Sequence, residues 1–163
     1  MIQILHKIRR DERGASIIEM ALVAPFLATL TIGMVDLSRA YSEKLFVEQA
    51  AQRAVERAMQ GMQGDESTDI FEGLQAEAAE TADVDADDVT VRYWLECNGV
   101  DQNTSEATMA DDYEKVCPDG QYYSRHISVS IEKTYTPMFS TKWLGANADG
   151  TLTFVGEAGM RVQ

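Results

Sequence analysis

A single glutamate inside an apolar run is the residue whose chemistry most needs an explanation. Glu19 lies five residues after Gly14 in the stretch RGASIIEMALVAP, residues 13–25. A charge at the centre of a bilayer costs about 2.5–3.5 kcal/mol on insertion scales. If the chain is cut after Gly14, Ala15 gains an α-ammonium one helical turn before Glu19 and on the same helix face. This amine could pair with Glu19 of its own chain or of a neighbour. The alternative is a glutamate that is tolerated near the membrane surface.

Two cysteines, Cys97 and Cys117, flank the polar stretch NGVDQNTSEATMADDYEKV. If this region is extracytoplasmic, an even pair favours a disulfide, which would hold a display loop on the sheet. Closing a loop of about 20 residues stabilises the fold by roughly 3 kcal/mol in the chain-entropy model. Two free thiols are the alternative, and the lack of a C-x-x-C spacing argues against a redox role.

The other polar side chains form no recognisable catalytic or metal motif. An EF-hand loop starting at Asp83 needs glycine at position 88 and glutamate at position 94, where the chain has Asp88 and Trp94. We interpret the run 83–88 as a solvated acidic turn, with a looser calcium site as the alternative, and the run 65–69 as a helix cap. His126 has no evident Ser or Cys nucleophile nearby, so we expect it at the surface. We therefore expect no catalytic residue, no metal and no cofactor.

A membrane-spanning helix must position Glu19. Residues 15–37 contain only two charges, Glu19 and Asp36, and as a helix they reach roughly 34 Å, enough for a hydrocarbon core of about 30 Å. Residues 1–14 hold four basic and two acidic groups, which favours a cytoplasmic N-terminus. Pro25 frees one helical carbonyl, so we expect a kink or a tolerated local loosening there. A cleaved secretory signal that releases a soluble domain after a weak Ser38-Arg39-Ala40 site is the competing interpretation.

The pattern beyond the membrane predicts an α+β domain over residues 39–163. Apolar residues at three- and four-residue spacing from Val47 to Met62 continue the helix until Gly61 and Gly64, and we expect this stripe to cover a sheet rather than to form a coiled coil. A second helix is predicted over about 68–81, with Ser67 or Thr68 as its N-cap. Period-two alternation predicts about three antiparallel strands, over 89–95, 126–132 and 152–162.

Four aromatic residues allow two interpretations. They could form a contact patch on the surface, or they could pack in the core and over the sheet. We favour packing for all four residues: Trp94, Tyr122, Tyr123 and Trp143.

Composition excludes two classes of function. The chain of 163 residues carries 14 Lys+Arg against 27 Asp+Glu, and its net charge of −13 repels a phosphate backbone, so nucleic-acid binding is not expected. Two cysteines and two histidines are too few for a Cys/His zinc cluster. A hydrophobic share of 45% is too high for a disordered chain.

The N-terminal stretch RGASIIEMALVAPFLATLTIGMVDLSRAY resembles the N-terminus of TadE-like pseudopilins of tight-adherence (Tad/Flp) pilus systems, within the wider type IV pilin group. The resemblance rests on Arg13-Gly14, Glu19, the run 21–25, Asp36 and the exit Arg39-Ala40-Tyr41, whereas Met20 stands where the family usually has an aromatic residue. It implies a pilin-like fold with a basic prepilin leader over 1–14, a transmembrane helix over 15–38 and a periplasmic domain over 39–163.

The resemblance also implies a function. A membrane aspartic prepilin peptidase would cleave between Gly14 and Ala15, and Glu19 would act in assembly. The implied partners are this peptidase, the major pilin, a sister pseudopilin and the inner-membrane assembly platform. The protein would then be a pseudopilin or minor pilin rather than an enzyme. A stand-alone membrane-anchored binding domain is the alternative.

Overall fold

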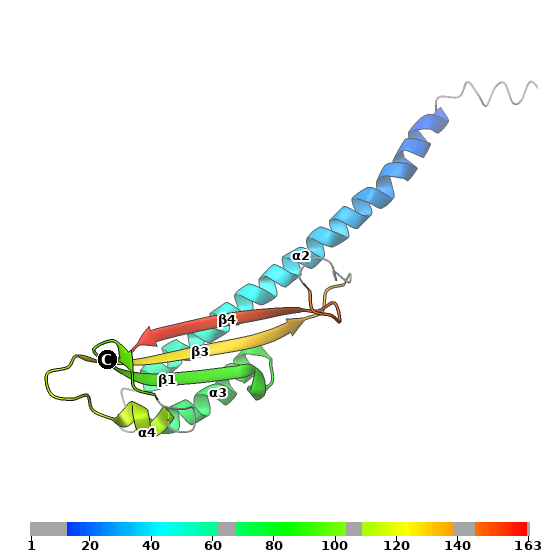
Figure 1. Ribbon diagram of the computed structural model, residues 1–163. Coiled ribbons are helices and arrows are strands. Elements are labelled where there is room, and N and C mark those ends of the chain that lie inside the picture. Colours follow the sequence, from blue (N-terminus) through cyan, green and yellow to red (C-terminus); the bar gives the residue numbers. More distant parts are fainter. Residues whose placement is uncertain (1–12, 62–67, 104–108, 139–145, 163) are drawn as a thin grey trace, which may run out of the picture. The chain divides into compact units, whose positions relative to one another are not determined.

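The computed structural model describes residues 13–61, 68–103, 109–138 and 146–162 (Figure 1). The chain divides into two compact units, Met1–Arg39 and Ala40–Gln163. The expected leader over residues 1–14 therefore lies almost wholly outside the described residues, as does Trp143.

The long helix predicted from the sequence is present. α2 spans Arg13–Gly61 without a break and contains Pro25. It ends at the first glycine after the apolar stripe, as expected for a residue that weakens helices. The kink at Pro25 stays a prediction.

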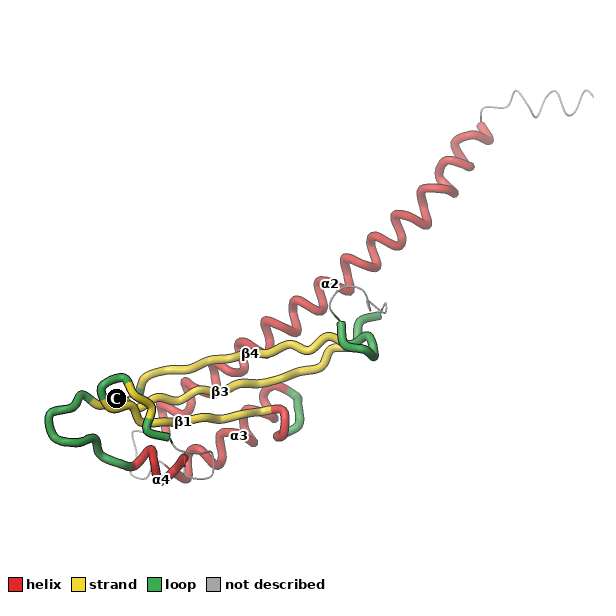
Figure 2. The backbone as a smooth tube through the Cα atoms, viewed as in Figure 1, coloured by secondary structure: helices red, strands yellow, loops and turns green. Residues whose placement is uncertain are grey.

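Four antiparallel strands form one sheet in the order β2-β1-β3-β4, as Figure 2 shows for the three long strands. They are β1 (Val89–Cys97), β2 (Val100–Asp101), β3 (Tyr123–Tyr135) and β4 (Leu152–Arg161). The sequence predicts the three long strands but not β2, because two residues are too few to show alternation. β2 pairs with β1 through a hairpin in which Asn98 and Gly99 have φ of 52° and 79°. Asn-Gly is the dipeptide that such a primed turn favours.

Three helical segments complete the fold. α3 spans Thr68–Ala82, one residue longer than predicted, whereas its proposed cap Ser67 lies outside the described residues. The short helices η1 (Ala86–Asp88) and α4 (Met109–Glu114) were not expected, since neither is long enough to show a helical stripe. The result is an α+β fold with a long N-terminal apolar helix, as the sequence predicts.

The core lies between the sheet and the C-terminal part of α2, joined by α3. Alternate residues of β1 and β3 face this core, and their partners face away, as the period-two pattern requires. The apolar stripe of α2 therefore covers the sheet, as predicted. The buried α2 side chains are all small: Val47, Ala50, Ala51, Ala54, Val55 and Ala58.

Gly156 of β4 explains why these α2 side chains are small. A Cβ atom at this position would lie 2.5 Å from both the carbonyl carbon and the carbonyl oxygen of Val47, and 2.7 Å from the amide nitrogen of Glu48. The strand thus packs directly against the helix backbone, and only glycine allows this approach.

Lys133 of β3 ties the sheet to both helices at one end of the core. Its Nζ donates a hydrogen bond of 3.0 Å to the carbonyl oxygen of Ala82, at the C-terminus of α3. The same ammonium lies 3.4 Å from Oε2 of Glu43 and 5.1 Å from the centre of the Phe46 ring, both on α2. A cation at a helix C-terminus also complements the helix dipole.

Candidate functional site

The first unit exposes an unusual amount of apolar surface. Every described side chain from Ser16 to Val35 is exposed, and Leu22 and Leu37 are each 72% exposed. Within the described residues, one helix, Ser16–Gln60, is long and apolar enough to cross a membrane. Large apolar side chains on all sides of a helix need an apolar surrounding. This segment therefore fits a single-pass membrane protein.

Glu19 is the polar feature of this segment on which the sequence argument depends. Ala15 and Glu19 both lie in α2, so the helix places them one turn apart, as their spacing requires. The Glu19 side chain is exposed, whereas Asp36, the other acidic side chain of the span, is buried. The carboxylate of Glu19 thus faces whatever surrounds the helix.

Two threonines show how the rest of the segment satisfies its polar groups. The hydroxyl of Thr29 donates to the carbonyl oxygen of Pro25, and that of Thr31 donates to the carbonyl oxygen of Leu27, each at 2.8 Å. Hydroxyls bonded to the preceding turn are compatible with lipid. Pro25 has no N–H for the carbonyl of Ala21, so this acceptor loses its usual donor.

The predicted disulfide is present. Cys97 at the end of β1 is bonded to Cys117, with a Cα–Cα distance of 5.6 Å. The bridge fastens the segment between α4 and β3 to the end of the sheet, where Cys97 pairs with Val100 on one side and Tyr123 on the other. A loop held on the sheet by a disulfide is thus confirmed.

His126 is not isolated, contrary to expectation. Its Nε2 lies 3.1 Å from Oγ of Ser124 and 3.5 Å from Oε2 of Glu96, and its ring stacks on Trp94 with 5.1 Å between centroids. Ser124 lies two residues before His126 on β3 and therefore on the same face of the strand, outside the predicted strand 126–132. A nucleophile relay needs the hydroxyl and the carboxylate on opposite ring nitrogens. Here both contact Nε2, so this cluster cannot act as such a relay.

The aromatic residues divide between packing and exposure. Trp94 packs on the outer face of the sheet between His126 and Arg92, whose Cζ lies 4.8 Å from the centre of the Trp94 ring. Tyr123 is exposed, and Tyr122 is 87% exposed, so the expectation that both pack is wrong. β3 begins at Tyr123, three residues before the predicted strand, and nothing in the sequence shows that Tyr122 lies beyond the sheet.

Tyr113 of α4 is buried, and no sequence pattern predicts this, because α4 is too short to show a helical stripe. Its ring meets Tyr93 edge to face at 5.4 Å, and the guanidinium of Arg125 lies 5.3 Å from its centre. Burial raises the pKa of the Tyr113 hydroxyl above its usual value of 10.0, and the nearby Arg125 charge partly opposes this effect. Tyr113 thereby attaches α4 to the core.

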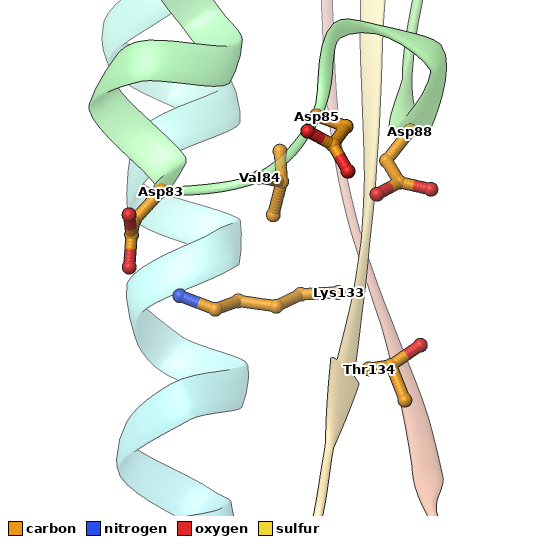
Figure 3. Close-up of a pocket in the computed structure, with 6 residues that line it drawn as sticks. All are labelled: Asp83, Val84, Asp85, Asp88, Lys133 and Thr134. Carbon is orange, nitrogen blue, oxygen red and sulfur yellow. The ribbon is translucent and has the colours of Figure 1, made fainter.

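The acidic turn lines a shallow pocket of about 370 Å³, shown in Figure 3. Its walls are Asp83, Val84, Asp85, Asp88, Lys133 and Thr134. In Figure 3 the carboxylate of Asp83 points away from those of Asp85 and Asp88. Within the described residues, no three acidic, His or Cys side chains gather as metal ligands. The acidic side chains of the run 83–88 are exposed, whereas the run 65–69 lies largely outside the described residues.

The comparisons with known proteins concern the first part of the chain. A family model described as TadE-like protein matches residues 14–56, which is about a quarter of the chain. No curated protein and no solved structure matches the chain. The match begins at Gly14 and includes Glu19, Asp36 and all but Ala58 of the buried α2 residues that cover the sheet. Residues 14–56 are thus similar to the TadE-like family, as their resemblance predicts.

Proposed function

We propose that the protein is a pseudopilin or minor pilin that acts in the assembly of a Tad/Flp-type pilus. The TadE-like match over residues 14–56 is the observation that carries this proposal. It coincides with a helix whose N-terminal part exposes large apolar side chains. Such a surface supports packing among similar helices, first in the membrane and then in an assembly. The protein is then a substrate of a protease rather than an enzyme.

Maturation by a prepilin peptidase would create a charged partner for Glu19. Water hydrolyses the peptide bond between Gly14 and Ala15, leaving a carboxylate on Gly14 and an ammonium on Ala15. The ammonium then lies one helical turn from Glu19 of the same chain, or contacts Glu19 of a neighbour. In a low-dielectric surrounding this pair offsets much of the cost of the buried charge. The ammonium at the N-terminus of one apolar helix can thereby align that helix with the Glu19 of a neighbouring helix.

The same proposal assigns the two sides of the membrane. The basic leader stays in the cytoplasm, and the domain from about residue 39 onward lies in the periplasm or on the pilus surface. The Cys97–Cys117 disulfide supports this orientation, because disulfides persist in oxidising compartments. The proposed partners are the prepilin peptidase, the major pilin, a sister pseudopilin and the inner-membrane platform, with no cofactor and no metal.

The mature N-terminus tests the proposal directly. We expect mass spectrometry of the membrane-extracted protein to find Ala15 as the first residue in cells with an active peptidase. Gly14→Val should leave the full-length chain, because a bulky residue replaces the small one at the cleaved bond. Gly33→Val is the matched control, since Gly33 lies in the same helix with nothing within 4 Å of an added Cβ. A mature protein that starts at Met1 would contradict the proposal.

A substitution at Glu19 tests maturation and assembly separately. Glu19→Ala should leave cleavage largely intact and strongly reduce pilus assembly, because the new amine loses its partner. Leu22→Ala changes another exposed side chain of the same segment and should reduce assembly much less, because it leaves the charge pair in place. Full assembly by Glu19→Ala would defeat the pairing argument. Full function after exchanging residues 1–38 for an unrelated anchor would indicate a stand-alone anchored binding domain instead.

A further inference from the structure

The disulfide-bonded end of the sheet exposes large apolar side chains. We call this surface the disulfide tip and define it by Val100, Val116, Tyr122 and Tyr123. Val116 and Tyr122 are each 87% exposed, and the other two are also exposed. Single exposed apolar residues need no explanation, but four that gather at one end of a fold mark a contact surface.

The strand register brings these residues together. Val100 and Tyr123 are the partners of Cys97 on its two sides, so the three side chains form one row on the same face of the sheet. Val116 precedes Cys117, which is bonded to Cys97. Tyr122 directly precedes the first residue of β3. Figure 2 shows the loop that carries Val116 and Tyr122 extending beyond the ends of β1 and β3.

Covalent and hydrogen bonds fix the tip before any partner arrives. The N–H of Asn98 donates to the carbonyl oxygen of Tyr122 at 2.8 Å, and the N–H of Tyr122 donates to Oδ1 of Asn98 at 3.0 Å. A turn closes the same loop, in which the N–H of Gln121 donates to the carbonyl oxygen of Pro118 at 3.1 Å. Ordering loops on binding costs affinity, and a pre-ordered loop avoids that cost.

Negative charge borders the tip. Glu114 is the last residue of α4, and Asp119 lies in the loop that follows. Both are exposed, and neither forms an ion pair with another residue of the described part of the chain. The nearby cations are already engaged. Lys115 pairs with Asp112, Arg92 pairs with Asp101, and Arg125 donates to the carbonyl oxygen of Tyr113 and lies 5.9 Å from the centre of the Tyr123 ring. The tip therefore offers apolar side chains with a net acidic border.

We infer that the disulfide tip docks into an apolar cleft with a cationic border on a different protein. Tyrosines fixed by their backbone are efficient anchors for such clefts. A second copy of this chain is a poor occupant, because residues beyond 14 carry 10 basic and 25 acidic groups and two acidic tips repel each other. An anionic lipid surface is disfavoured for the same reason. This inference does not depend on the proposed pilus function.

Photocrosslinking in intact cells tests the docking. Val116 is replaced by the photoreactive p-benzoylphenylalanine in the full chain, and the adduct is sequenced. We expect an adduct to one other protein, whose yield falls about tenfold with Tyr122→Ser and with the pair Glu114→Lys and Asp119→Lys. In isolated membranes, raising NaCl to about 0.5 M should also lower the yield, because salt screens exposed charges.

Matched variants keep this result interpretable. Val155→Ser removes an exposed apolar side chain from β4, and Asp87→Lys reverses a charge at the far end of β1, so neither should change the yield. In every variant, cysteines that do not react with a thiol reagent before reduction confirm that the disulfide has formed. An adduct to a second copy or to lipid, no adduct, or a yield that ignores the charge reversals would each overturn the inference.

Discussion

Residues 16–37 and residues 47–58 lie in the same helix, α2, yet the first segment exposes its large apolar side chains and the second buries small ones. In the first segment Ile, Leu, Phe and Met occur on all sides of the helix. In the second segment Val and Ala face the sheet, and charged or amide side chains face away. The helix therefore suits two different surroundings, an apolar one for the first segment and its own sheet for the second.

Side-chain size differs between the two segments for a physical reason. A sheet that packs against a helix backbone leaves room only for Ala and Val, and Gly156 sets that distance. Lipid imposes no such limit, so the first segment maximises apolar area at about 25 cal/mol per Å² removed from water. Substitutions that change size should thus be costly in one segment and nearly neutral in the other.

The largest effect is expected where β4 meets α2. Gly156→Ala places a methyl group 2.5 Å from backbone atoms of Val47, so either the strand or the helix must move. We expect a loss of about 3 kcal/mol in the free energy of unfolding, measured by urea denaturation of the full chain in detergent. Gly73→Ala, an open position on α3, is the control and should stabilise slightly. An unchanged urea midpoint for Gly156→Ala would show that helix and strand are not in close contact.

A pair of identical substitutions compares the two segments directly. Val47→Ala removes a fully buried side chain and should cost about 2 kcal/mol, including a cavity term. Val23→Ala removes the same atoms from a half-exposed side chain in the first segment, and the domain's unfolding free energy should not change. The same urea titration measures both variants. Equal losses would mean that the first segment also packs on the domain.

Much of this contrast can be predicted from the sequence, because long periodic segments are informative. The apolar run, the Ala-rich stripe and the three alternating strands each give their element and its buried face. The disulfide follows from an even cysteine pair. Features that depend on a single contact do not follow. Tertiary neighbours determine four such features, and none of them produces a repeating hydrophobic pattern in the sequence. They are the two-residue strand β2, the short helix α4, the fit at Gly156 and the exposure of Tyr122.

Charged side chains at the core should contribute more to the free energy of unfolding than charged side chains at the surface, and two lysines allow this comparison. Lys133→Met keeps an apolar stem but loses the bond to the carbonyl oxygen of Ala82 and the contact with Glu43, so we expect a loss of about 1 kcal/mol. Lys44→Met is the control, because Lys44 and Glu48 form an exposed pair at 3.7 Å that contributes little. Thermal unfolding followed by circular dichroism compares the two variants. A larger loss for Lys44→Met would contradict this assignment.

Of the four predicted effects in this comparison, the smallest is that of alkali. High pH should lower the free energy of unfolding of the domain and leave the apolar segment in the membrane. Because burial raises the folded pKa of Tyr113 above its usual 10.0, Tyr113 adds stability that is fully present below that value and is lost as pH rises through the folded pKa. Urea midpoints followed by tryptophan fluorescence between about pH 8 and 11 measure this loss.

Tyr113→Phe isolates that contribution, since lysines and the exposed tyrosines titrate in both proteins. The variant should lose less stability than the wild type above pH 10.0, while both proteins stay in the membrane pellet after alkaline extraction. The apolar segment holds the protein there through area buried in lipid, which does not titrate. If both proteins lost stability equally, the buried hydroxyl would play no part. If alkali released the wild type from the membrane, the apolar segment would not be its anchor.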